Sequence, residues 1–195
     1  MWLGQLPPDD QRLLVRLPYR VGLFLSAADT TGGLVADMEE RQALRVLLTA
    51  YVQDTLKSQQ IQILMEETIA QQSDWPHWGD EISAVPSECV QAITLLSPIL
   101  NAKDLSAFKA NLIEIALTVA LAYREIDKAT HGLTRMNIYL HLWLDRWRAF
   151  IAGDAISAQD EILNVSAAER QALQLLAQSL ERDIRLGGRT LKGAA

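Results

Sequence analysis

Apolar side chains recur every three or four positions along most of the chain, which is the spacing of one face of an α-helix. The stripes are clearest over residues 44–52, 112–123 and 173–184. No stretch of strand length alternates apolar and polar residues with enrichment in β-branched side chains. The pattern therefore predicts an all-α protein, a single-domain bundle of about seven or eight helices.

Prolines and glycines separate the periodic stretches and set the expected helix boundaries. We expect a first helix over residues 9–17 that bends or restarts at Pro18 and runs to about Ala28. We expect a loop over residues 73–86, and Pro86 suits the first turn of the helix that follows. The further expected helices cover residues 38–53, 55–72, 86–100, 104–124, 134–152 and 167–185.

The pentapeptide ERQAL occurs twice, beginning at Glu40 and at Glu169. A short polar residue stands three positions before each glutamate, Asp37 in the first copy and Ser166 in the second. This spacing is that of a capping box, in which the polar side chain accepts from free helix N–H groups and the glutamate reaches back. Each copy is thus predicted to open a capped helix. Whether the pair reflects duplication or only shared capping requirements stays open.

A longer order of features surrounds the two copies. An apolar helix end, a short acidic loop, an aliphatic residue and a capped helix follow one another over residues 24–41. A similar order, with different spacing, recurs over residues 112–130 and 150–170. The chain is therefore predicted to contain an internal pseudo-repeat of helical hairpins.

This order resembles the tellurite-resistance TerB-like family. The family's hallmark is an apolar helix that ends in Ala-Asp-Gly, then an aliphatic residue, then an Asp or Ser cap followed by Glu-Arg. The residues that match it are Ala28, Asp29, Gly33, Leu34 and the segment 37–41. At the second junction, Tyr123 and Arg124 stand in place of Asp-Gly, and Thr130 stands in place of the capping Glu.

The resemblance implies a bacterial, stress-associated interaction module rather than an enzyme, with an acidic surface that binds metal or partners. Carboxylate oxygens suit the hard cations Ca²⁺ and Mg²⁺. The candidate ligands at the acidic helix junctions are Asp29, Asp37, Glu40, Glu125 and Asp127. The alternative account is that acids at helix N-termini act only as caps and as partners of the helix dipole.

Two other functions stay open. A metal-dependent hydrolase or sensor could hold a transition metal at His77, Asp80 and Glu81, although these residues also suit an ordinary polar loop. A structural helical dimer, or a protein partner, could use the aromatic stripe of Tyr139, Trp143 and Trp147, which otherwise belongs to the core. Cys89 has no histidine in register with it, so no catalytic residue is assigned.

Length, composition and net charge limit the classes of protein to which the chain can belong. The 195 residues suit one domain, and an apolar content of 49% is ample for a core. A net charge of −6 argues against binding to the phosphates of nucleic acids. The sequence has a single cysteine and shows no secretory signal and no apolar run of membrane-spanning length. We therefore expect a cytoplasmic protein. We expect a helical domain over residues 1–186 and a flexible tail over 187–195, because Gly187 and Gly188 should end the last helix.

Overall fold

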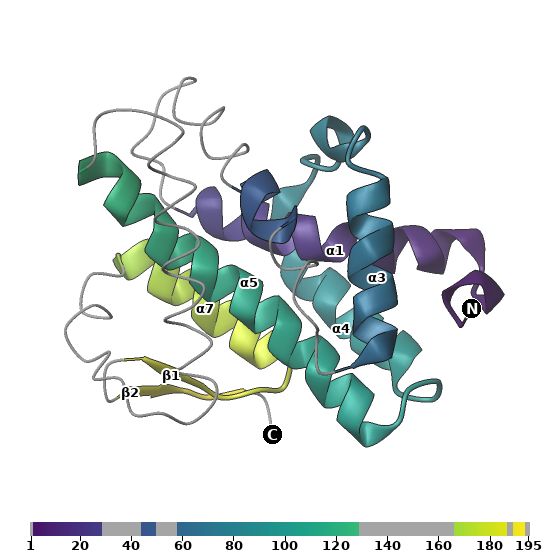
Figure 1. The fold of residues 1–195 in the computed structure, drawn as a ribbon. Coiled ribbons are helices and arrows are strands. Elements are labelled where there is room, and N and C mark those ends of the chain that lie inside the picture. Colours follow the sequence, from purple (N-terminus) through teal and green to yellow (C-terminus); the bar gives the residue numbers. More distant parts are fainter. Residues whose placement is uncertain (1, 29–43, 50–57, 129–165, 187–188, 194–195) are drawn as a thin grey trace.

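The computed structural model describes residues 2–28, 44–49, 58–128, 166–186 and 189–193, and this part of the chain is helical apart from one small hairpin (Figure 1). The all-α prediction is confirmed, whereas the total of seven or eight helices and the pseudo-repeat stay predictions. The helices are α1 (Pro8–Ser26), α3 (Gln59–Ala70), α4 (Val85–Leu96), α5 (Ala102–Lys128) and α7 (Ala167–Ser179), with 3₁₀ turns η1 (Leu3–Gln5), η2 (Trp75–His77) and η3 (Ile82–Ala84). Residues 44–49 are also helical.

Helix α1 lies at the centre of the described fold and packs against α3, α4 and α5, while α7 lies against α4 and α5 (Figure 1). The contact faces are the apolar stripes that the sequence spacing predicts. In α1 the buried stripe includes Leu14, Leu17, Val21 and Leu25; in α5 it includes Phe108, Leu112, Ile115 and Val119. These residues belong to one continuous apolar core. No helix in the described ranges is both long and apolar enough to cross a membrane.

Helix α1 runs through Pro18 as one element, where the sequence predicted a bend or a restart. Proline has no N–H group, so position 18 cannot donate to the carbonyl of Leu14. The burial of Pro18 compensates for the lost hydrogen bond, so the helix continues through this position. Close packing continues at Gly22, where a Cβ atom would overlap the side chain of Leu44.

The loop predicted over residues 73–86 is present, and two 3₁₀ turns, η2 and η3, stiffen it. Helix α4 then begins at Val85, with Pro86 in its first turn as expected. It ends at Leu96, four residues earlier than the sequence predicted. Ser97 keeps helical backbone angles, but Pro98 has no N–H group to continue the helical hydrogen bonds, which accounts for the earlier end.

The second ERQAL copy opens α7 as predicted. Ser166 accepts a hydrogen bond from the backbone N–H of Glu169, and the Glu169 carboxylate accepts one from the backbone N–H of Ser166. This reciprocal pair is the capping box. The first copy, with Asp37 and Glu40, lies outside the described residues.

The C-terminal end of the chain differs from the sequence expectation. Helix α7 ends at Ser179, not near residue 185. Beyond it, β1 (Ile184–Leu186), where the last helix was expected to end, pairs antiparallel with β2 (Arg189–Leu191), which lies in the segment expected to be a flexible tail. Strands of three residues each are too short to show alternation in the sequence, which is why helix periodicity was extended across them. The backbone N–H of Gly193 donates to the Asp183 carboxylate beside the hairpin.

Candidate functional site

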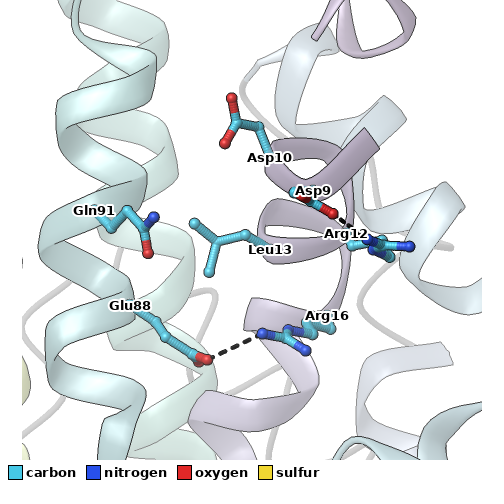
Figure 2. A pocket seen from close by; sticks show the side chains of 7 residues that line it. All are labelled: Asp9, Asp10, Arg12, Leu13, Arg16, Glu88 and Gln91. Atoms are coloured by element: carbon cyan, nitrogen blue, oxygen red, sulfur yellow. Dashed lines mark hydrogen bonds and ion pairs between the residues drawn. The ribbon is translucent and has the colours of Figure 1, made fainter. Parts of the chain in front are cut away.

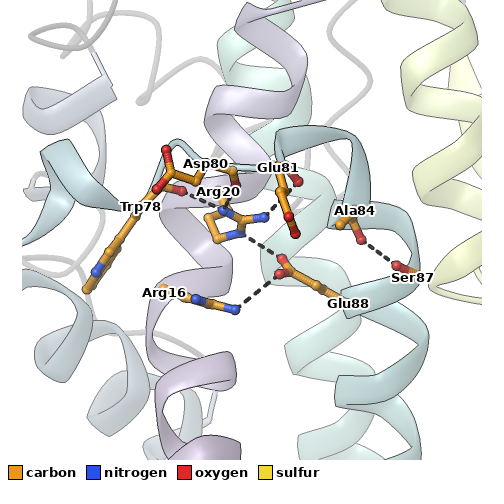
Figure 3. A network of polar contacts seen from close by, with 8 residues as sticks. All are labelled: Arg16, Arg20, Trp78, Asp80, Glu81, Ala84, Ser87 and Glu88. Carbon is orange, nitrogen blue, oxygen red and sulfur yellow. Dashed lines mark hydrogen bonds and ion pairs between the residues drawn. The ribbon is translucent and has the colours of Figure 1, made fainter.

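A buried ion pair joins α1 to α4. Arg20 of α1 is only 3% exposed, and its Nε donates to Oε2 of Glu88 on α4 at 2.7 Å. Arg16, one helical turn earlier, donates from Nη2 to the other carboxylate oxygen, Oε1, at 3.3 Å (Figure 3). One carboxylate therefore serves two guanidinium groups, and Arg20 makes the shorter contact.

The same arginine holds the loop between α3 and α4. Arg20 Nη1 donates to the backbone carbonyls of Trp78 and Asp80 at 2.6 and 2.7 Å, and Nη2 donates to that of Glu81 at 3.1 Å (Figure 3). Glu81 adopts a left-handed backbone conformation, with φ 48°. Such a conformation is unfavourable for a residue with a Cβ, so it needs support from its surroundings. The guanidinium fork of Arg20 supplies part of that support.

An aromatic cluster lies beside this network. Tyr19 of α1 stacks on Trp75 with 4.5 Å between ring centroids, and Trp78 lies edge-on to Tyr19 at 6.0 Å. The indole N–H of Trp75 donates to the carbonyl of Thr68, and the Thr68 hydroxyl donates to the carbonyl of Val15. The loop is thus fixed to both α1 and α3, which indicates a rigid scaffold.

A polar recess opens at the surface next to this scaffold, between the first half of α1 and α4 (Figure 2). Its volume is ≈ 310 Å³. Asp9, Asp10, Arg12, Leu13 and Arg16 line it from α1, and Glu88 and Gln91 line it from α4. The recess thus combines two carboxylates, an apolar side chain and two guanidinium groups on the α1 side, a combination that suits a charged ligand of modest size.

The predicted cation ligands fall into two groups. Glu125 and Asp127 lie in α5, and Lys128 is the last residue of this helix that the structure describes. Asp29, Asp37 and Glu40 lie outside the residues that the structure describes. In the part of the chain that is described, no group of three His, Cys, Asp or Glu side chains could hold a metal ion. A cation bound at Glu125 and Asp127 would therefore need further ligands from residues that the structure does not describe.

The alternative metal site is not assembled by the described loop. His77, Asp80 and Glu81 are all exposed, and no group of three potential ligands that includes them is found among the described residues. The hydrogen bonds that Asp80 and Glu81 make to Arg20 use their backbone carbonyls. Tyr139, Trp143 and Trp147, the candidate partner surface, lie outside the described residues.

One buried and one partly buried ionisable group have shifted pKa values. Burial raises the pKa of the Cys89 thiol, and the neighbouring Glu88 carboxylate raises it further. Cys89 is therefore a protonated core residue, which makes it a poor nucleophile. Burial also raises the pKa of Glu114, on α5, to about 7 from 4.5, and the Arg182 guanidinium offsets part of that rise.

Arg16, Arg20 and Glu88 were not among the site residues predicted from the sequence. The signal was present, because both arginines stand four residues apart within the apolar stretch LLVRLPYRVGLFL, where a charge must find a partner. What the sequence lacked was the identity of that partner, since Glu88 is 68 positions from Arg20 along the chain.

Comparison with known proteins adds no relative: no protein-family model, curated protein or solved structure matches this chain. The likeness to the TerB-like family therefore rests on the short motifs in the sequence.

Proposed function

We propose that this chain is a non-enzymatic, stress-associated interaction module of the TerB-like kind, which binds a divalent cation or a basic partner at its acidic helix junctions. The observation that carries the proposal is the presence of two carboxylates, Glu125 and Asp127, in α5 beyond its buried apolar stripe. Carboxylate oxygens are the ligands that hard cations prefer, so this pair can contribute to a cation site.

This position weakens the alternative account for these two residues. Acids at a helix N-terminus are explained by capping and by the helix dipole, but Glu125 and Asp127 lie far from the N-terminus of α5 at Ala102. Arg124 and Lys128 are close to them along the chain and can offset part of the negative charge. A bound cation would relieve the remainder, and a basic partner would do so in the same way.

A thermal unfolding series tests the cation. We expect millimolar Ca²⁺ or Mg²⁺ to raise the melting temperature more than NaCl at matched ionic strength, because a ligand that binds only the folded state stabilises it by mass action. The extra rise should vanish in a double variant, Asp37→Asn with Asp127→Asn, which removes one carboxylate from each junction.

A second double variant, His77→Ala with Asp80→Asn, serves as the matched control. It changes two exposed loop residues and leaves the junctions intact. Loss of the divalent effect in this control but not in the junction variant would place the cation at the loop and favour the metal-dependent alternative. Equal shifts with divalent salt and NaCl in the unmodified chain would contradict a specific cation site.

A further inference from the structure

We propose that the recess between α1 and α4 binds a short peptide with free termini, whose carboxylate pairs with Arg16 and whose ammonium pairs with Asp10. The inference concerns a different site from the α5 junction and does not depend on it. It rests on the arrangement of charges in the recess and on the distance between them.

The two charged ends belong to one side of α1. Asp10, Leu13 and Arg16 are spaced by three residues each, so they follow one another along the helix, and all three line the recess (Figure 2). Glu88 and Gln91, also three residues apart, line it from α4. A ligand in the recess would therefore lie roughly parallel to α1.

The Arg16 end has a positive charge that is only partly compensated. Glu88 is the acceptor for both Arg16 and Arg20, and the shorter bond, 2.7 Å against 3.3 Å, goes to Arg20. The Arg16 side chain is 40% exposed, and within the described part of the chain its Nε has no partner. A guanidinium has five N–H donors, and a carboxylate is the acceptor that its planar fork matches best.

The opposite end of the recess carries the negative charge of Asp10. The neighbouring carboxylate, Asp9, is occupied by an ion pair with Arg12. Across the described residues no ion pair or hydrogen bond involves the Asp10 side chain, which is half-buried at the edge of the recess. The helix dipole favours an acid in this first turn, yet that effect alone does not explain a guanidinium at the other end of the same recess.

The spacing selects the length of the ligand. Positions 10 and 16 are separated by six residues, which is about 9 Å along an α-helix. Three extended residues span at most about 10–11 Å, so the ammonium and carboxylate of a free tripeptide fit this separation. Leu13 contacts the middle of such a ligand, and the exposed Gln91 amide can both donate to and accept from its peptide groups.

Amide chemical shifts of the ¹⁵N-labelled full chain test the inference. Trialanine with free termini should shift the amide signals of residues lining the recess, Leu13 and Gln91 among them. The same peptide with an acetylated N-terminus and an amidated C-terminus should bind at least about tenfold more weakly, because it lacks both charges.

Three variants identify the residues responsible. Asp10→Asn and Arg16→Gln should each weaken binding about three- to fivefold, as expected for partly exposed ion pairs. Lys103→Gln removes one exposed charge on α5 that does not line the recess, and should leave binding unchanged. Asp10→Asn removes no hydrogen bond or ion pair among the described residues, so it reports on the ligand even where Arg16→Gln disturbs the ion pair with Glu88.

Three outcomes would overturn the inference. Equal binding of free and blocked trialanine would show that the termini are not recognised. Unchanged affinity in both Asp10→Asn and Arg16→Gln would show that these residues are not the contacts. Absence of shifts at the recess with either peptide would show that it is not a peptide site, and the cation proposal for α5 would be unaffected.

Discussion

Arg20 in helix α1 and Asn111 in helix α5 are both buried polar side chains, but they differ in their hydrogen bonding. Arg20 of α1 is 3% exposed and donates hydrogen bonds to a carboxylate and to three backbone carbonyls. Asn111 of α5 is 4% exposed, and within the described residues neither atom of its amide has a partner. The charged group is thus the better accommodated of the two.

The difference shows that the cost of a buried polar group depends on its partners rather than on its charge. A buried charge is tolerated when hydrogen bonds replace those lost to water, whereas an unpaired buried amide loses them without compensation. Burial is also unfavourable for Glu114, three residues after Asn111 in α5. Its pKa is raised to about 7 chiefly by burial, so its charged form is poorly accommodated.

The largest expected effect comes from Arg20. Replacing it with leucine leaves the Glu88 carboxylate buried without its closest partner and frees three loop carbonyls. Removal of one member of a buried ion pair typically costs about 3–5 kcal/mol. We expect Arg20→Leu to lower the free energy of unfolding by about that amount, measured by urea denaturation.

Arg16→Gln is the matched control for this prediction. It removes a guanidinium from the same carboxylate, but the Arg16 side chain is 40% exposed and its bond is longer. We expect a loss below about 1 kcal/mol. Similar losses for Arg16→Gln and Arg20→Leu would contradict the assignment of Arg20 as the main partner. Adding Glu88→Leu to Arg20→Leu should recover part of the loss, because it removes the uncompensated charge.

An intermediate effect is expected at Glu114 and depends on pH. Its pKa is about 7 in the folded chain against an ordinary 4.5, so between these values the folded state holds a proton that the unfolded state has released. Stability from this group is therefore complete below about pH 4.5 and is lost as pH rises towards 7. We expect roughly 1–3 kcal/mol of pH-dependent stability in this window.

Glu114→Gln should remove that contribution, since glutamine does not titrate. Urea denaturation of both proteins at several pH values from 4 to 8 measures the difference, with pH values chosen to bracket the two pKa values. The two stability curves should converge at low pH and separate as pH rises, with the glutamine variant the more stable at pH 8. Parallel curves would show that Glu114 is not the group responsible.

The sequence predicted local features of this fold better than contacts between distant segments. The Ser166–Glu169 capping box was predicted because all its atoms lie within four consecutive residues. The apolar stripes of α1 and α5 were predicted for the same reason, since helix periodicity is local. The Arg20–Glu88 pair was missed, because it depends on how α1 and α4 cross.

The same reasoning explains the errors at the ends of elements. Helix α7 was extended past Ser179 because Leu180 and Ile184 continue its apolar spacing, yet Ile184 belongs to β1. A three-residue strand is stabilised by its partner strand and not by its own pattern. The recess could not be predicted either, because Asp10 and Arg16 acquire a shared cavity only when α4 lies beside them.

The smallest expected effect is a gain in stability at Asn111. Leucine has the same branched shape as asparagine but no polar atoms, so Asn111→Leu removes two unpaired polar atoms and keeps the side chain's outline. We expect the free energy of unfolding to rise by about 1 kcal/mol, measured by urea denaturation.

Asn101→Leu provides the matched control, because Asn101 precedes the same helix and is fully engaged. Its Oδ1 accepts from the backbone N–H of Asp104, and its Nδ2 donates to the Asp104 carboxylate. Loss of this cap should cost about 1 kcal/mol. The same substitution would thus act with opposite sign at Asn111 within α5 and at Asn101 just before it, according to whether the amide has partners. A loss at Asn111 as large as that at Asn101 would show that the buried amide is bonded after all, and the contrast with Arg20 would fail.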